Sequence, residues 1–407
     1  MQPFAWENED MGDPLGVYIS VPFCKAKCSF CNFASDAFAA SRIDGYLARV
    51  ASEMAGVGQL AQQHGLMQPQ VVDTVYFGGG TPSLLSGEQL GEVFAALRSG
   101  WHVSPDAEIT VECAPGQIAD AALDAMLRLG VSRISMGVQS FVDAESAAVG
   151  RLHTRAQCLD EIARLRSRGV GNVGIDLICG LPHQTRASWR DTVEIAIESG
   201  VKHISVYMLE VDDESRLGRE LIGGGARYRA GLVPHEDVVA EMYLEACELL
   251  GAAAIGQYEI SNFARDGFQS VHNRKYWTRK PYLGFGLDAH SMLLDADGNA
   301  ARFANAEELD EYLAEDFLQR EVLRVSHEEA FEEAVFLGLR LAEGISFAQM
   351  REQFGDAHVT RLEEKAHTLA REDLMRVENG RAMLTARGRV VSSSVFGELL
   401  AEEAVAR

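Results

Sequence analysis

Six short apolar runs alternate with amphipathic segments along the first two-thirds of the chain, and this alternation limits the possible folds more than any other feature. The runs are typical of buried strands and cover residues 17–21, 72–78, 108–113, 133–138, 173–179 and 203–209. Between them apolar residues recur every three or four positions, and Ser86 with Gln89 forms a capping-box pattern that opens one helix. Alternating strands and helices pair in parallel through right-handed crossovers. Because six units are two fewer than a closed eight-stranded barrel, the sequence predicts an α/β fold with a partial (β/α)6 barrel; the alternative is a doubly wound open sheet.

The pattern becomes helical after about residue 300. Helical periodicity covers residues 306–319, 327–342, 347–354 and 359–375, and residues 377–384 have the pattern of a hairpin around Asn379-Gly380. We therefore expect two domains, a barrel over residues 1–300 and a helical, winged-helix-like domain over residues 301–407. A wing often contacts DNA, but the acidity of this chain favours a packing module or a lid.

The charge of the chain limits its partners. Its 407 residues include 37 Lys and Arg against 60 Asp and Glu, a formal net charge of −23. Because affinity for nucleic acid comes from basic side chains that neutralise phosphates, we expect no nucleic-acid partner. No stretch has the roughly 18 uncharged apolar residues of a membrane span. Residues 1–10 lack the basic and apolar regions of a signal peptide, so we expect a cytoplasmic protein.

Three of the seven cysteines lie close together, directly after the first predicted strand. Cys24, Cys28 and Cys31 have the spacing C-x3-C-x2-C. Three thiolates on one tight loop can bind three irons of a [4Fe–4S] cluster, which leaves the fourth iron for the amino and carboxylate groups of S-adenosylmethionine (SAM). The alternatives are a zinc knuckle or buried thiols, but zinc usually needs a further Cys or His at paired spacing. The remaining cysteines are expected to be small buried apolar residues: Cys113, Cys158, Cys179 and Cys247.

Glycine and polar residues follow several predicted strands, at the end where a barrel builds its site. Gly78-Gly79-Gly80-Thr81-Pro82 follows the second strand, and exposed N–H groups of such a run can bind a carboxylate. Glu112 ends the third strand, Gln139 follows the fourth and Arg151 opens a later segment. Asp176 lies in the otherwise apolar fifth strand, where an isolated charge is costly and must be paired or bound. We interpret these residues as ligand contacts; the alternative is an Arg151–Asp176 ion pair.

A polar and aromatic segment begins with His272-Asn273-Arg274-Lys275-Tyr276-Trp277. A neutral imidazole with aromatic neighbours can ligate haem iron while the rings pack on the porphyrin. A single histidine in an aromatic loop is more often a packed, hydrogen-bonded residue. The spacing alone therefore leaves both interpretations open.

Seven motifs in this order resemble those of the radical SAM superfamily, and more narrowly those of its oxygen-independent coproporphyrinogen III oxidase-like group. They are VPFC at residues 21–24, GGGTPS at 78–83, MGVQSF at 136–141, GRLH at 150–153, DLICGLP at 176–182, YEISNF at 258–263 and HNxxYW at 272–277. The resemblance implies a partial (β/α)6 barrel with a C-terminal helical domain, a [4Fe–4S] cluster on Cys24, Cys28 and Cys31, and SAM as cofactor. It also implies an electron donor such as flavodoxin or ferredoxin.

The resemblance assigns SAM contacts residue by residue and assigns no catalytic side chain. The matching positions that contact the cluster-bound SAM are Tyr18, Phe30, Gly79 and Glu112. The positions that hold a second SAM in the dehydrogenase of this group are Gly80, Thr81, Gln139, Arg151 and Asp176. Whether SAM is cleaved or only bound is left open by the sequence.

Two features favour the haem-chaperone branch of this group over its dehydrogenase branch. The dehydrogenase has a further cysteine two residues after its cluster motif, where this chain has Phe33, and a long segment before the barrel, where this chain has sixteen residues. The HNxxYW motif is associated with haem in the chaperone branch, which implies His272 as a haem contact. We therefore expect a protein that binds haem and transfers it to an acceptor protein. The alternatives are oxidative decarboxylation of coproporphyrinogen III and another two-SAM reaction, such as methyl transfer.

Two positions depart from the pattern of the group. Cys113-Ala114-Pro115 follows Glu112, where relatives more often have Ala-Asn-Pro. Asp288 stands in a glycine-rich segment where a further glycine is usual. The second departure lies in the loop beside the HNxxYW motif and can alter that loop.

Overall fold

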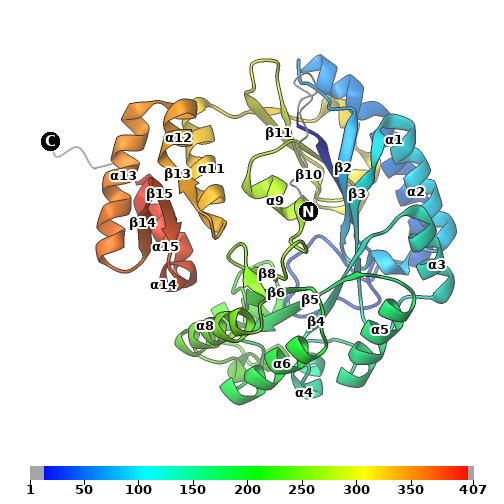
Figure 1. The fold of residues 1–407 in the computed structure, drawn as a ribbon. Helices are drawn as coiled ribbons and strands as arrows, with labels where there is room; N and C mark the ends of the chain where they lie inside the picture. Colours follow the sequence, from blue (N-terminus) through cyan, green and yellow to red (C-terminus); the bar gives the residue numbers. More distant parts are fainter. Residues whose placement is uncertain (1–12, 402–407) are drawn as a thin grey trace.

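Twelve strands pair into one mixed sheet in the computed structural model, which describes residues 13–401 (Figure 1). The first six are β1 (Leu15–Val21), β2 (Val71–Gly79), β3 (His102–Cys113), β4 (Arg133–Gln139), β5 (Asn172–Cys179) and β6 (His203–Met208). They lie side by side in chain order, and each neighbouring pair is parallel. All six predicted strands are thereby confirmed, although β3 begins earlier than its apolar run. The signal-peptide prediction concerned residues 1–10, which lie outside the described range.

Six shorter strands extend the sheet on both sides and were not predicted. They are β7 (Gly256–Gln257), β8 (Asn262–Ala264), β9 (Tyr282–Phe285), β10 (His290–Leu294), β11 (Ala300–Ala304) and β12 (Leu323–Arg324). β9 pairs in parallel with β1, whereas β10, β11 and β12 continue as antiparallel neighbours. On the other side β8 pairs antiparallel with β6 and β7. Within residues 13–401 the order runs from β12 to β7 without closing, so the predicted open barrel is confirmed.

Helices cover the convex face of the parallel strands (Figure 1). They are α1 (Ile43–Gln63), α2 (Gly87–Gly100), α3 (Asp120–Leu129), α4 (Asp143–Ala148), α5 (Arg155–Ser167), α6 (Arg186–Glu198) and α8 (Glu236–Ala252). Helix α7 (Arg216–Ile222) instead packs beside the cysteine loop, where Leu217 N donates to Ser29 O, and short 3-10 turns lie at Ala40–Arg42, Pro82–Leu84 and Arg227–Leu232. The Ser86–Gln89 capping box forms as predicted. Val17 and Ile19 of β1 share one buried core with Val50 of α1, and burying each such side chain contributes about 1.5–3 kcal/mol.

One helix lies on the other side of the sheet. Helix α9 (Val271–Trp277) carries the HNxxYW motif and sits within the concave side of the sheet in Figure 1. Its His272 side chain bonds Thr74 of β2, and its Lys275 pairs with Asp73 of the same strand at 2.7 Å. This helix therefore fills the barrel interior near the amino ends of the strands and leaves space for a site at their carboxyl ends.

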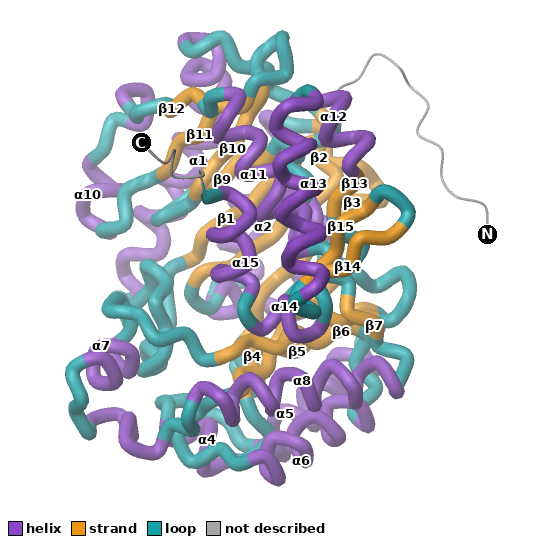
Figure 2. The backbone as a smooth tube through the Cα atoms, turned by 90° about the vertical axis from the view of Figure 1, so that its left-hand side faces the viewer, coloured by secondary structure: helices purple, strands orange, loops and turns teal. Residues whose placement is uncertain are grey.

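The C-terminal region forms a second unit with its own core. Its elements are α11 (His327–Arg340), β13 (Ile345–Ser346), α12 (Phe347–Phe354), α13 (Asp356–Arg371), β14 (Met375–Glu378), β15 (Arg381–Leu384), α14 (Ala386–Val390) and α15 (Ser392–Leu400). The preceding α10 (Leu309–Ala314) and a 3-10 turn at Phe317–Gln319 pack on the core of the large sheet instead. Asn379 and Gly380 both have positive φ, as the predicted hairpin turn requires. In Figure 2, where this unit faces the viewer, α13 lies beside that hairpin, and α15 packs on α13. Because β11 and β12 belong to the large sheet, the helical region begins later than its periodicity predicted.

The two units meet at the segment that carries the YEISNF motif. Ile260 belongs to the second core, and Arg340 of α11 pairs with buried Glu259 at 3.6 Å. Among the helices that the structure describes, none is long and apolar enough to cross a membrane.

Candidate functional site

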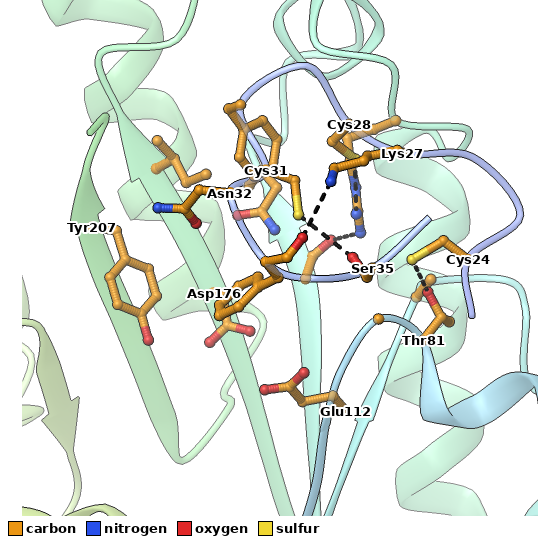
Figure 3. A pocket seen from close by; sticks show the side chains of 18 of the residues that line it. Cys24, Lys27, Cys28, Cys31, Asn32, Ser35, Thr81, Glu112, Asp176 and Tyr207 are labelled. Atoms are coloured by element: carbon orange, nitrogen blue, oxygen red, sulfur yellow. Dashed lines mark hydrogen bonds between the residues drawn. The ribbon is translucent and has the colours of Figure 1, made fainter. Parts of the chain in front are cut away.

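A cavity of about 350 Å³ lies at the carboxyl ends of β2–β6, beneath the loop that follows β1 (Figure 3). Eleven of the thirteen residues that the sequence predicted for the site line it together. They are Cys24, Cys28, Phe30, Cys31, Gly79, Gly80, Thr81, Glu112, Gln139, Arg151 and Asp176. Residues from six segments of the chain therefore converge here, as the strand topology predicts.

The cysteine loop is fixed at both ends by backbone hydrogen bonds. Cys24 N donates to Asp36 O at 2.9 Å, and Asp36 N donates to Pro22 O at 3.0 Å, which closes the loop onto the end of β1. Farther along, Ser29 N donates to Val149 O at 3.1 Å. These bonds place the three thiols on one wall of the cavity without a regular element to carry them.

Each cysteine sulfur has a polar partner from a different part of the site. Thr81 Oγ1 lies 3.6 Å from Cys24 Sγ, Arg151 Nη1 lies 3.5 Å from Cys28 Sγ and Ser35 Oγ lies 3.8 Å from Cys31 Sγ (Figure 3). Hydrogen bonds to cysteine sulfurs stabilise thiolates and tune the potential of an iron–sulfur cluster. Burial raises the pKa of Cys24 and Cys31, so these thiols keep their protons until a metal displaces them. Among residues 13–401, no three His, Cys, Asp or Glu side chains converge on one metal-ion position.

The glycine run after β2 packs against the cysteine loop. A Cβ at Gly80 would lie 2.7 Å from Val21 O, so only glycine allows this approach, and Gly79 has a φ of 97°. Gly80 N donates to Val21 O and Thr81 N donates to Phe23 O, each at 2.9 Å. The expectation that N–H groups of this run face a ligand is therefore wrong for these two, because the cysteine loop uses them.

Two carboxyl groups, Glu112 on β3 and Asp176 on β5, lie across the floor of the cavity from the cysteines. Tyr76 donates from its hydroxyl to Glu112 Oε1 at 2.8 Å. Burial, together with the charge of Asp176, raises the pKa of Glu112 to about 7. Asp176 lies 3.4 Å from Ser135 Oγ, and burial also raises its pKa.

Arg151 and Gln139 keep polar atoms free for a ligand. Arg151 donates to the carbonyl of Gly137 and to Cys28 Sγ rather than to Asp176, so the alternative of an Arg151–Asp176 ion pair is not what the structure shows. Arg151 Nε and Gln139 Oε1 are buried atoms without a partner in the described chain. Gln139 also has a φ of 67°, a conformation that non-glycine residues adopt mainly where the surroundings impose it. Orphaned buried polar atoms that line a cavity fit a polar cofactor such as SAM.

The other two predicted residues, Tyr18 and His272, lie outside this cavity. Tyr18 stacks on Tyr76 and lines a neighbouring cavity. His272 is 1% exposed; its Nδ1 lies 2.9 Å from Thr74 Oγ1 and its Nε2 lies 2.8 Å from the Tyr276 hydroxyl. Burial lowers the pKa of this imidazole to about 3. Iron ligation by His272 stays a prediction, and it would require the ring to leave both partners.

Some residues at the cavity were not predicted from the sequence. Tyr207 lines it from β6, and Ser205 on the same face of that strand bonds Asp176. The alternation of side chains along β6 was the signal that could have found them. Cys113, expected to be a buried apolar residue, is buried and also lines the cavity edge.

Both units of the chain match families of known proteins. Residues 18–196 match the family model of the radical SAM superfamily, and residues 325–391 match that of the HemN C-terminal domain. The heme chaperone HemW of Synechocystis is 36% identical over 349 residues, which cover 83% of this chain and 80% of the relative. The chain belongs to the HemW family of radical SAM proteins. The HemW of Lactococcus lactis is 31% identical over 96% of this chain and 98% of its own length.

The solved structures confirm the fold of this HemW-family chain. Coproporphyrinogen III oxidase (HemN) from Escherichia coli superposes with a TM-score of 0.79 over 95% of this chain and 90% of that one, at 23% identity. Radical SAM proteins carry a [4Fe–4S] cluster and SAM. The three thiols and the orphaned polar atoms of the cavity fit both groups.

The raised pKa of Glu112 predicts that SAM binding depends on pH. As the SAM contact that the family resemblance implies, Glu112 would be protonated below about pH 7 and would lose its attraction for the cationic groups of SAM. We expect SAM affinity to fall about ten-fold between about pH 7.5 and about pH 6. Anaerobic calorimetric titration of the cluster-loaded protein measures this slope. Glu112→Gln should flatten it, and an equally steep slope in that variant would assign the titration to another group.

Proposed function

We propose that this HemW-family protein is a haem chaperone of the cytoplasm, which binds haem and passes it to an acceptor protein. The observation that carries the proposal is the match over nearly the whole chain to relatives that are named heme chaperones. A second observation supports it. Phe33, at the position of the dehydrogenase's additional cysteine, is 60% exposed and lines the cysteine cavity, where it offers apolar surface instead of a thiol.

The cofactor residues are those that the family resemblance implies, and all of them except Tyr18 line the cysteine cavity. Cys24, Cys28 and Cys31 would hold the [4Fe–4S] cluster, which when reduced supplies an electron to SAM. Contacts to the cluster-bound SAM would come from Tyr18, Phe30, Gly79 and Glu112. A second SAM would be held by Gly80, Thr81, Gln139, Arg151 and Asp176, of which Arg151 and Gln139 have free polar atoms.

We propose two protein partners, and we propose different roles for the two domains of the chain. The protein would transfer its haem to an acceptor protein, and a flavodoxin or ferredoxin would reduce the cluster. Residues 1–300 would carry the cofactors, while residues 301–407 would pack against them as a helical module. The Arg340–Glu259 pair and the shared core at Ile260 support such packing.

An anaerobic assay tests the proposal against coproporphyrinogen III decarboxylation. The cluster-loaded protein is incubated with SAM, a strong reductant and coproporphyrinogen III, and porphyrin products and 5′-deoxyadenosine are followed by mass spectrometry. We expect no decarboxylated product, while the same preparation binds haem. Decarboxylated product formed over many turnovers would make the protein an enzyme of haem synthesis instead.

A further inference from the structure

A second cavity adjoins the cysteine cavity, and none of the three cluster cysteines lines it. Its volume is also about 350 Å³. Phe33 and Gly79 line both cavities, so the two open side by side at the carboxyl end of the barrel. Its other walls come from β1, α9, β9, the turn before β10 and the start of β10. The residues that matter here are Tyr18, Tyr276, Tyr282, Asp288 and His290.

His290 is the free imidazole of this cavity. Its side chain is 68% exposed, and its Nε2 lies 3.7 Å from Asp288 Oδ1. A histidine that binds a metal usually donates its other ring N–H to a carboxylate, which orients the ring. At 3.7 Å, Asp288 lies just beyond hydrogen-bond distance of Nε2, so a small rotation of the exposed ring would form this bond and leave Nδ1 for a metal. His272 offers no such nitrogen, since both of its nitrogens are bonded inside the barrel.

The turn that carries this pair is held in an unfavourable backbone conformation. Asp288 has a φ of 55°, where glycine is the least strained residue and where aspartate is retained at some cost. Buried side chains impose the turn: Gly286 N donates to Glu53 Oε2 at 3.1 Å, and Leu287 N donates to the Tyr46 hydroxyl at 2.9 Å. Strain of this kind persists where the surroundings fix it, often at binding sites.

The other walls suit a flat macrocycle. Tyr276 and Tyr282 meet edge to face with ring centroids 4.6 Å apart, and exposed Phe33 stands at the boundary of the two cavities. Aromatic rings of this kind pack well on a porphyrin plane. Tyr276 is held by His272, because its hydroxyl lies 2.8 Å from His272 Nε2.

We propose that this second cavity binds haem, with His290 as an axial ligand of the iron and Asp288 as the carboxylate that orients it. The inference rests on the proposed function and deepens it. His272 is then a positioning residue, which supports the cavity wall through Tyr276 rather than contacting iron.

Haem titration of the full, cluster-loaded chain tests the ligand. Ferric haem is added anaerobically, and the Soret band and electron paramagnetic resonance report affinity and iron ligation. His290→Ala should weaken haem binding at least about ten-fold and change the Soret band. The matched control is His235→Ala, since His235 is another exposed histidine beside an aspartate, 3.2 Å from Asp237, but lies outside both cavities. It should bind haem as the wild type does.

Asp288→Gly separates a binding role from a folding role. Glycine suits the positive φ, so the turn should be kept and cluster iron should be unchanged, while haem affinity should fall about ten-fold. The inference would be overturned if His290→Ala bound haem with the affinity and spectrum of the wild type. It would also be overturned if the spectral signature of histidine ligation were lost in His272→Ala but kept in His290→Ala. If the wild-type protein itself binds no haem, the proposed function fails and the inference fails with it.

Discussion

Cys28→Ala should abolish the iron–sulfur absorbance of the protein. Two thiolates on this loop cannot replace three, and Arg151, which bonds Cys28 Sγ at 3.5 Å, would then face the remaining sulfurs without its partner. Iron and sulfide content after anaerobic reconstitution, together with the visible spectrum, measure the loss. We expect iron to fall from about four per chain to background.

Cys158→Ala is the matched control for this experiment. Cys158 is a fully buried cysteine of α5 and lies outside the cavity, so its removal should leave the cluster spectrum intact. Full iron loading in Cys28→Ala would contradict the ligand assignment. Equal iron loss in both variants would point to general instability of the fold instead.

Arg320→Ala should destabilise the protein by about 3–5 kcal/mol, because it leaves a buried charge without its partner. Arg320 Nη1 lies 2.6 Å from Glu53 Oε1, and the two side chains are 2% and 1% exposed. Glu53 also accepts hydrogen bonds from Asn305 and Tyr312, each at 2.8 Å, and it fixes Gly286 in the turn before β10. Urea unfolding at equal cluster loading measures the loss in the free energy of unfolding.

The control for this variant is a more exposed ion pair, between Arg324 of β12 and Asp295 after β10. Arg324 lies 3.2 Å from Asp295, its side chain is 49% exposed, and its removal should cost at most about 1 kcal/mol. Because Glu53 holds the turn that carries Asp288 and His290, Arg320→Ala should also weaken haem binding. A loss no larger than that of Arg324→Ala would show that the buried pair is not needed for the fold.

The sequence predicted the parts of this fold that are long and locally patterned. The six parallel strands are continuous apolar runs between helices, and C-x3-C-x2-C identifies the cysteine loop without any tertiary contact. The carboxyl ends of these strands then place Glu112, Gln139 and Asp176 in one cavity, as the barrel topology requires.

The rest depends on contacts between distant segments. β9, β10 and β11 are four or five residues long and carry little strand pattern of their own. His272 is bonded to Thr74, which lies nearly two hundred positions earlier in the chain. The spacing of residues within the HNxxYW motif therefore could not distinguish a packed histidine from a ligand. Likewise the N–H groups of Gly80 and Thr81 are used by the cysteine loop, which only the folded structure brings to them. The second cavity could not be predicted for the same reason, because its walls combine residues 18–79 with residues 276–290.

The most direct test of a haem chaperone with this architecture is one titration of ferric haem into the cluster-loaded full chain, followed by addition of a haem-free acceptor protein. We expect saturable binding of about one haem per chain, with a histidine-ligated spectrum, and release of the haem to the acceptor while cluster iron stays constant. No saturable haem binding by a protein with an intact cluster would contradict it.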